Sequence, residues 1–132
     1  MDFILDNLAI GNAQEAAQPP GEITALLCVA QEINIQEIVR IQYKVPIIDM
    51  QPIPARQLRE AVEWIMENIA LQTILVFCNA GVGRSSSVVI AYLCAVLDFG
   101  FGEAVEYVAT KRPYMSILPN LLLSIQQVKS LL

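Results

Sequence analysis

The sequence contains no histidine, and this absence limits the chemistry available to its 132 residues. Histidine is the commonest general acid–base group in enzymes, so a carboxylic acid is the natural candidate for any proton transfer here. The chain has only three cysteines, with no metal-ligand spacing, which makes a disulfide framework or a zinc site unlikely. We therefore expect no metal ion, and a reducing, cytoplasmic setting.

Charge and long apolar runs are also scarce. Charged residues make up 16% of the chain and the net charge is −5, which argues against a nucleic-acid partner because such partners require a basic face. The longest apolar run, Val88–Leu97, covers about ten residues. A membrane-spanning helix needs about 20, so we expect no membrane segment. Hydrophobic residues nevertheless reach 55%, which predicts one well-filled domain over residues 1–132, expected to be monomeric.

The apolar patterns alternate between short strand-like runs and longer helical ones. Strands are predicted at 8–12 (with its turn), 25–29, 45–48 and 74–77, whereas 33–41 stays ambiguous. Helices are predicted at 12–18, 56–70, 86–97 and 103–111, with a last helix that starts at Pro119. This order predicts an α/β fold with a mostly parallel central sheet of four to five strands flanked by helices.

The most informative segment, Cys78–Ser85, joins the predicted strand 74–77 to the predicted helix 86–97. A strand, a tight loop and a helix N-terminus form a cradle for anions, because backbone N–H groups converge there and the helix dipole favours negative charge. A cysteine at the start of such a cradle is favoured as thiolate and is therefore a nucleophile. Arg84 can hold two phosphate oxygens with its planar fork, so the loop predicts thiolate attack on a phosphoryl group.

The remaining loop residues fit the same interpretation. Gly81 and Gly83 permit backbone angles and close approaches that other residues forbid. Ser85 is expected to donate a hydrogen bond to the Cys78 sulfur, which stabilises the thiolate as attacker and as leaving group. The neutral residues are expected to contribute N–H groups and to line the pocket: Asn79, Ala80 and Val82.

Asp49 is the candidate proton donor. It follows the predicted strand 45–48, and the carboxyl ends of parallel strands meet at one edge of a sheet, where ligands usually bind. That placement would bring Asp49 close to Cys78. The alternative is an ordinary loop or capping aspartate. Lys111 and Arg112 are interpreted as a solvated helix end.

These motifs resemble the protein tyrosine phosphatases, and in detail the dual-specificity phosphatase family. Cys78–Ser85 resembles the signature Cys-x5-Arg-Ser/Thr. Leu8–Gly11 resembles the opening strand and turn of that family, and Tyr43–Asp49 resembles its general-acid segment. The closing motif is matched by Lys111–Pro113 followed by Pro119–Asn120. The resemblance thus extends over nearly the whole chain.

The resemblance implies a small phosphatase fold, a cysteinyl-phosphate intermediate and no metal or organic cofactor. It assigns the nucleophile to Cys78, the phosphate clamp to Arg84 and the general acid to Asp49. It further assigns thiolate stabilisation to Ser85 and support of the phosphate loop to Asn120. The substrate it implies is a phosphorylated protein or peptide, carrying phosphotyrosine or, in a shallow pocket, phosphoserine or phosphothreonine.

One residue departs from the family pattern. The family usually places histidine directly before the nucleophile, whereas this chain has Phe77. We expect the change to weaken thiolate activation and to give a slower enzyme or a more alkaline optimum. Phe77 also keeps open a second function, a phosphopeptide-binding pseudophosphatase. A phosphoinositide or RNA phosphatase is ranked lower, because the loop interior lacks the extra basic residues that such substrates favour.

Overall fold

A computed structural model describes all residues, 1–132, and contains one five-stranded sheet in the order β1-β2-β5-β3-β4. Strand β1 (Asp2–Leu5) pairs antiparallel with β2 (Leu8–Gly11), and every other neighbouring pair is parallel. The middle strand is β5 (Ile74–Phe77), which lies between β2 and β3 (Ala25–Cys28). The remaining edge is β4 (Ile41–Lys44). The predicted α/β class and mostly parallel sheet are confirmed.

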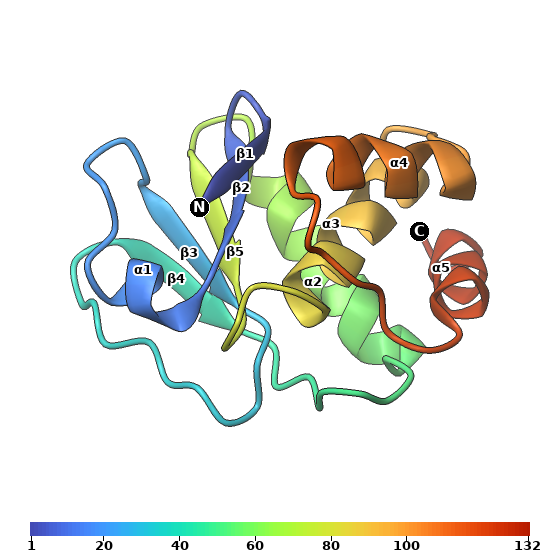
Figure 1. Ribbon diagram of the computed structural model, residues 1–132, viewed down its shortest axis with the longest axis horizontal. Coiled ribbons are helices and arrows are strands. Elements are labelled where there is room, and N and C mark those ends of the chain that lie inside the picture. Colours follow the sequence, from blue (N-terminus) through green and yellow to red (C-terminus); the bar gives the residue numbers. More distant parts are fainter.

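Five helices accompany the sheet. Four of them gather on one side of it: α2 (Ala55–Asn68), α3 (Arg84–Ala95), α4 (Phe101–Lys111) and α5 (Leu121–Lys129) (Figure 1). The short helix α1 (Ala13–Ala17) begins with a capping box between Asn12 and Glu15 and lies next to the end of β5. No helix is long and apolar enough to cross a lipid bilayer.

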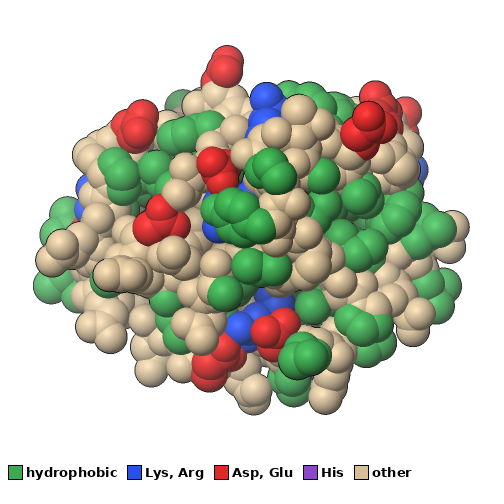
Figure 2. All heavy atoms as spheres, viewed as in Figure 1, with side chains coloured by type: hydrophobic (Ala, Val, Ile, Leu, Met, Phe, Trp, Pro, Cys, Tyr) green, Lys and Arg blue, Asp and Glu red, His purple; other side chains and the backbone are tan.

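Charged side chains are sparse on the face of the molecule drawn in Figure 2. Lys and Arg form only a few separated spots there, most of them next to Asp or Glu, and hydrophobic side chains cover much of the remainder. This face therefore presents no continuous basic area. The distribution agrees with the low charged fraction of 16%.

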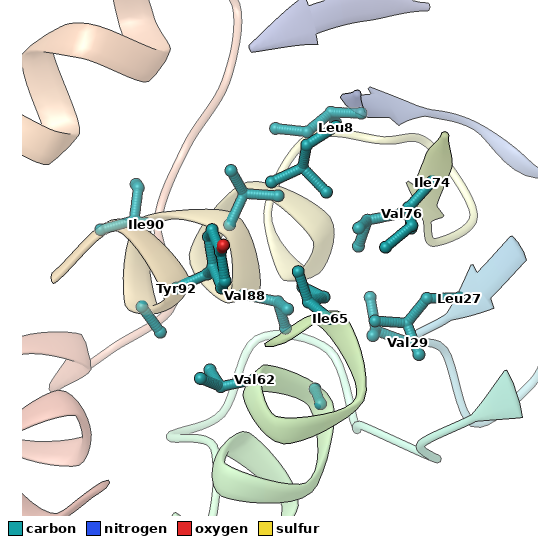
Figure 3. Packing of buried hydrophobic residues seen from close by; sticks show 14 of the residues in the cluster. Leu8, Leu27, Val29, Val62, Ile65, Ile74, Val76, Val88, Ile90 and Tyr92 are labelled. Atoms are coloured by element: carbon teal, nitrogen blue, oxygen red, sulfur yellow. The ribbon is translucent and has the colours of Figure 1, made fainter. Parts of the chain in front are cut away.

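The core lies between the sheet and helices α2 and α3. Figure 3 shows Leu27 of β3 and Val76 of β5 directed towards Ile65 of α2, with Val88 of α3 close by. Full burial of one such side chain contributes roughly 1.5–3 kcal/mol, so this layer is the main source of stability. Helix α3 is buried from Arg84 to Cys94, which includes its polar first turn as well as the apolar run that begins at Val88.

The strand predicted at 45–48 is wrong. Pro46 has no N–H to donate to the sheet, and the strand lies four residues earlier as β4. The Val45 N–H still donates to the Cys28 carbonyl, but beyond it the chain leaves the ladder. The period-2 alternation Ile41-Gln42-Tyr43-Lys44 is the signal of an edge strand, and it begins at the last residue of the segment 33–41 that stayed ambiguous.

Two further differences concern the ends of the chain. The antiparallel strand β1 was not predicted. The last helix begins at Leu121 rather than Pro119, because Asn120 adopts a left-handed conformation with φ 56° and breaks the helical path between them. The buried stripe of α5 therefore starts with Leu121, and Leu122 is exposed.

Candidate active site

The loop between β5 and α3 turns its backbone N–H groups away from the rest of the protein. No N–H from Asn79 to Gly83 donates a hydrogen bond within the chain. The loop carbonyls, by contrast, are tethered: the Asn79 oxygen accepts from the Ala13 N–H at 3.1 Å and the Val82 oxygen accepts from the Ser116 N–H at 3.0 Å. The C=O and N–H of a trans peptide point in opposite directions, so each tether turns the next N–H towards the pocket.

Gly81 is required by the shape of this loop. Its φ is +71°, and an added Cβ would lie 2.5 Å from the Gly11 carbonyl oxygen and 2.6 Å from Arg112 Nη2. Gly83 differs from the expectation, since its φ is −102° and a Cβ there would meet nothing closer than 3.4 Å. The backbone argument for glycine therefore holds at Gly81 and not at Gly83.

A Gly81→Ala substitution is expected to lower the free energy of unfolding by about 1–3 kcal/mol and to weaken phosphate binding. The backbone must move to relieve the contact with Gly11, and the loop N–H groups move with it. Chemical denaturation and a phosphate titration measure the two effects. Gly102→Ala is the matched control, because it adds the same methyl to helix α4 where nothing lies within 4 Å. A stable Gly81→Ala variant with unchanged phosphate affinity would contradict this account.

Cys78 lies at the base of the cradle. Its side chain is buried, and its Sγ lies 3.4 Å from the hydroxyl oxygen of Ser85, the second residue of α3. The structure thus brings together the two groups that the sequence paired. Cys78 opens onto a cavity of about 360 Å³. That cavity is lined by Asp49, Met50, Cys78, Ala80, Val82, Gly83, Arg84, Ser116, Ile117, Leu118 and Pro119.

Arg84 lies in the wall of the same cavity with its side chain only 1% exposed. Its Nη1 and Nη2 donate to the two carboxylate oxygens of Glu32 at 2.7 and 2.5 Å, and Nη1 also donates to the Ile47 carbonyl at 3.0 Å. Its buried Nε has no hydrogen-bond partner. The Nε–H and the outer N–H of Nη2 lie on one edge of the guanidinium, so this edge is free to bind two oxygens of an anion.

Glu32 was not identified from the sequence. It follows β3, so its position after a parallel strand, at the same sheet edge as Cys78, is the signal that could have found it. The hydrogen bonds from Arg84 lower the pKa of the Glu32 carboxyl from an ordinary value of 4.5 to about 2. Because the folded-state pKa is depressed, the pair is fully present at neutral pH and is lost only as the pH falls towards about 2.

Asp49 also reaches the cavity, although no strand directly precedes it. Its Oδ1 accepts the Met50 N–H at 2.9 Å and lies 3.8 Å from Arg84 Nε, and its side chain is half-exposed. Met50 has a φ of 61°, so the chain turns sharply at this point. A carboxyl group at the mouth of the cavity can exchange protons with solvent and with a bound molecule.

The remaining predicted residues have different surroundings. The Asn120 side chain is exposed and makes no hydrogen bond with the loop, so its supporting role stays a prediction. The interpretation of Arg112 as a solvated helix end is wrong: the side chain is 1% exposed and its Nε donates to the Gly81 carbonyl at 2.7 Å. Phe77 is buried in the core within β5. No group of three or more Cys, Asp or Glu side chains could hold a metal ion.

Comparison with known proteins places this site in a family. The model of the family "Dual specificity phosphatase, catalytic domain" matches residues 10–130. Dual specificity protein phosphatase 15 of Mus musculus is 27% identical over 128 residues, which cover 91% of this chain and 54% of the relative. Phosphatidylglycerophosphatase and protein-tyrosine phosphatase 1 of Mus musculus is 35% identical over 81 residues, covering 60% of this chain and 42% of the relative.

A solved structure agrees with these matches. The human tyrosine phosphatase-like serine/threonine/tyrosine-interacting protein has a TM-score of 0.85 at 23% identity, covering 99% of this chain and 96% of that one. The chain spans about half the length of the curated relatives just described. The family match covers most of the chain, including the cradle, Arg84 and Asp49. The chain therefore belongs to the dual-specificity phosphatase family.

Proposed function

We propose that the protein is a cysteine-dependent phosphatase, which hydrolyses phosphotyrosine and, more slowly, phosphoserine and phosphothreonine in protein substrates. One observation carries the proposal: Cys78 lines one cavity together with loop residues whose N–H groups are unpaired and with Arg84, whose Nε is unpaired. Donors fixed in advance around a nucleophile are suited to the charge of a phosphoryl group in transfer. Membership of the dual-specificity phosphatase family supports the same reaction.

The first chemical step is attack of the Cys78 thiolate on phosphorus. The sulfur–phosphorus bond forms as the bond to the substrate oxygen breaks, and the Asp49 carboxyl donates its proton to that leaving oxygen. The loop N–H groups and Arg84 hold the phosphoryl oxygens throughout. The product is a cysteinyl phosphate and a free hydroxyl group. The position of Asp49 in the same cavity as Cys78 supports its role as the acid.

The second step is hydrolysis of the cysteinyl phosphate. The Asp49 carboxylate, now unprotonated, accepts a proton from a water molecule as the water oxygen attacks phosphorus. The sulfur leaves as thiolate, and a hydrogen bond from the Ser85 hydroxyl stabilises it. The Sγ to Oγ distance of 3.4 Å supports this role. Inorganic phosphate is released and the enzyme returns to its starting state.

The walls of the cavity favour a single phosphate on an apolar carrier. Arg84 is the one basic residue in the lining, and Glu32 balances its charge. Apolar side chains form much of the wall, among them the exposed Met50 and Ile117. A phenyl ring packs well against such side chains, which supports phosphotyrosine as the preferred substrate. A phosphoinositide carrying several phosphates would find no second cation in the lining.

We also infer the setting in which the protein acts. All three cysteines are free and buried, which supports a reducing compartment and hence the cytoplasm. The net charge of −5 supports a phosphorylated protein as partner, in preference to nucleic acid or an anionic membrane. We propose a monomer as the working form.

Rapid-mixing kinetics with p-nitrophenyl phosphate, followed by turnover of matched phosphopeptides, test the proposed function. We expect a burst of nitrophenol as the cysteinyl phosphate accumulates, then steady turnover. Phosphotyrosine peptides should be hydrolysed faster than the phosphoserine and phosphothreonine versions of the same sequence. Phosphate binding without release of nitrophenol at any pH would favour the pseudophosphatase. Faster turnover of a phosphoinositide than of any peptide would favour a lipid phosphatase.

A further inference from the structure

Arg112 is a buried cation directly behind the phosphate loop. It follows the last residue of α4 and is 1% exposed. Its Nε donates to the Gly81 carbonyl at 2.7 Å, and its Nη1 donates to the Asp2 carboxylate at 2.6 Å and to the Ile10 carbonyl at 3.4 Å. The ring of Tyr114 lies 4.7 Å from the centre of its guanidinium. Arg112 takes no part in the two chemical steps proposed above.

The bond to Gly81 differs in kind from the other tethers of the loop. The carbonyls of Asn79 and Val82 are held by backbone N–H groups, which almost any residue supplies. The Gly81 carbonyl is held by a side chain. The orientation of the peptide between Gly81 and Val82 therefore depends on the identity of one residue, Arg112.

This peptide carries one of the donors that face the phosphate site. No peptide bond in the chain is cis, so the Val82 N–H points opposite to the Gly81 carbonyl. Arg112 pulls that carbonyl to the back of the loop, and the N–H is thereby turned towards the cavity that Val82 lines. Loss of the bond would allow the peptide to rotate, since Gly81 has no side chain to resist rotation.

Asp2 holds the guanidinium in place. A charge as buried as that of Arg112 requires a partner, and the Asp2 carboxylate on β1 supplies it. Two anchors on different strands, Asp2 of β1 and the Ile10 carbonyl of β2, fix the plane of the guanidinium. A lysine has no planar fork and cannot reproduce these contacts together with the one to Gly81.

We propose that Arg112, anchored by Asp2, is a positioning residue that orients the Gly81–Val82 peptide and so directs the Val82 N–H at the substrate phosphate. The inference rests on the proposed phosphatase function. A hydrogen bond to a charged group contributes about 1.5–3 kcal/mol, so loss of this donor is expected to weaken phosphate binding about tenfold or more. A residue that served only the stability of the fold would leave the affinity of the folded protein unchanged.

The test is a titration of ¹⁵N-labelled protein with inorganic phosphate, in which the amide signals of Val82 and Ala80 are followed separately. In the parent protein both should shift. In Arg112→Lys, the Val82 shift should be lost and the Kd for phosphate should rise about tenfold. The Ala80 shift should persist, since the Asn79 carbonyl is held by backbone. Lys111→Met is the matched control, because it removes an exposed neighbouring charge.

Asp2→Asn removes the charge that anchors Arg112, so the guanidinium should hold the Gly81 carbonyl less firmly. We expect the Val82 shift to be weakened selectively, with a Kd raised a few-fold; this variant decides the question if Arg112→Lys does not fold. An unchanged Val82 shift and unchanged Kd in a folded variant would overturn the proposal. Failure of the parent protein to bind phosphate or to hydrolyse p-nitrophenyl phosphate would instead overturn the proposed function.

Discussion

The Cys78→Ser variant is expected to lose all measurable turnover yet to keep its affinity for inorganic phosphate. A serine hydroxyl remains protonated at neutral pH and is a far weaker nucleophile than a thiolate. Removal of the nucleophile from another covalent hydrolase costs about 10⁶-fold in kcat, which indicates the scale of the loss. The donors that bind phosphate, the loop N–H groups and Arg84, do not depend on the sulfur.

Steady-state hydrolysis of p-nitrophenyl phosphate and a phosphate titration measure the two halves of this result. Cys94→Ser is the matched control: Cys94 is also free and buried, but it lies in the twelve-residue helix α3, beyond the residues that line the cavity. That variant should keep full turnover. Residual turnover in Cys78→Ser beyond a trace would remove Cys78 from the role of nucleophile. If the folded Cys78→Ser variant lost phosphate binding, the loop N–H groups and Arg84 could not bind phosphate independently of the sulfur, contrary to this account.

Asp49→Asn is expected to lower kcat roughly 10²–10⁴-fold for substrates with a poor leaving group. An amide cannot protonate the departing oxygen, so the tyrosine phenolate, or the alkoxide of serine or threonine, would have to leave unassisted. The loss should be much smaller for p-nitrophenyl phosphate, whose phenolate is stable without a proton. Hydrolysis of a phosphotyrosine peptide and of the aryl phosphate, compared in the same variant, measures the difference.

Asp98→Asn provides the control for Asp49→Asn. The side chain of Asp98 is 94% exposed, and the variant makes the same change from aspartate to asparagine. The backbone of Asp98 is left-handed, with a φ of 63°, and asparagine tolerates this conformation. Its activity on both substrates should equal that of the parent protein. Equal losses on both substrates in Asp49→Asn would show that the carboxylate shapes the cavity instead of donating a proton. The contact of 3.8 Å between Asp49 and Arg84 Nε is the physical reason to make that distinction.

The parts of the fold that the sequence predicted are those with strong local patterns. The run Ile74–Phe77 is apolar on both sides because it is the middle strand, and α2 has a stripe of buried residues at helical spacing. Strand β4 was misplaced because an edge strand buries little: Ile41 and Tyr43 are 48% and 38% exposed. Val45 and Ile47 are fully buried without belonging to a strand. Their apolar side chains therefore gave the segment 45–48 the sequence pattern of a buried strand.

The candidate site divides in the same way. One loop and the start of α3 hold three of the predicted site residues within eight positions of sequence: Cys78, Arg84 and Ser85. Their spacing alone was therefore enough to predict that they share a site. Glu32 and Arg112 reach the loop from distant segments and carry no motif of their own. Arg112 also follows an exposed lysine at a helix end, where a basic residue normally faces solvent. Only tertiary packing distinguishes it from its neighbour.

The carbonyl tethers of the loop have a consequence for folding. They come from α1, from the end of α4 and from the segment before α5, all remote from the loop in sequence. Contacts of this kind form late, since distant parts of the chain must first meet. A partly folded chain that has formed only β5 and α3 would contain Cys78, the proposed nucleophile, but its loop N–H groups would not yet be oriented. The thiol would then be exposed without the means to recognise phosphate, and phosphatase activity should appear only with the last cooperative step of folding.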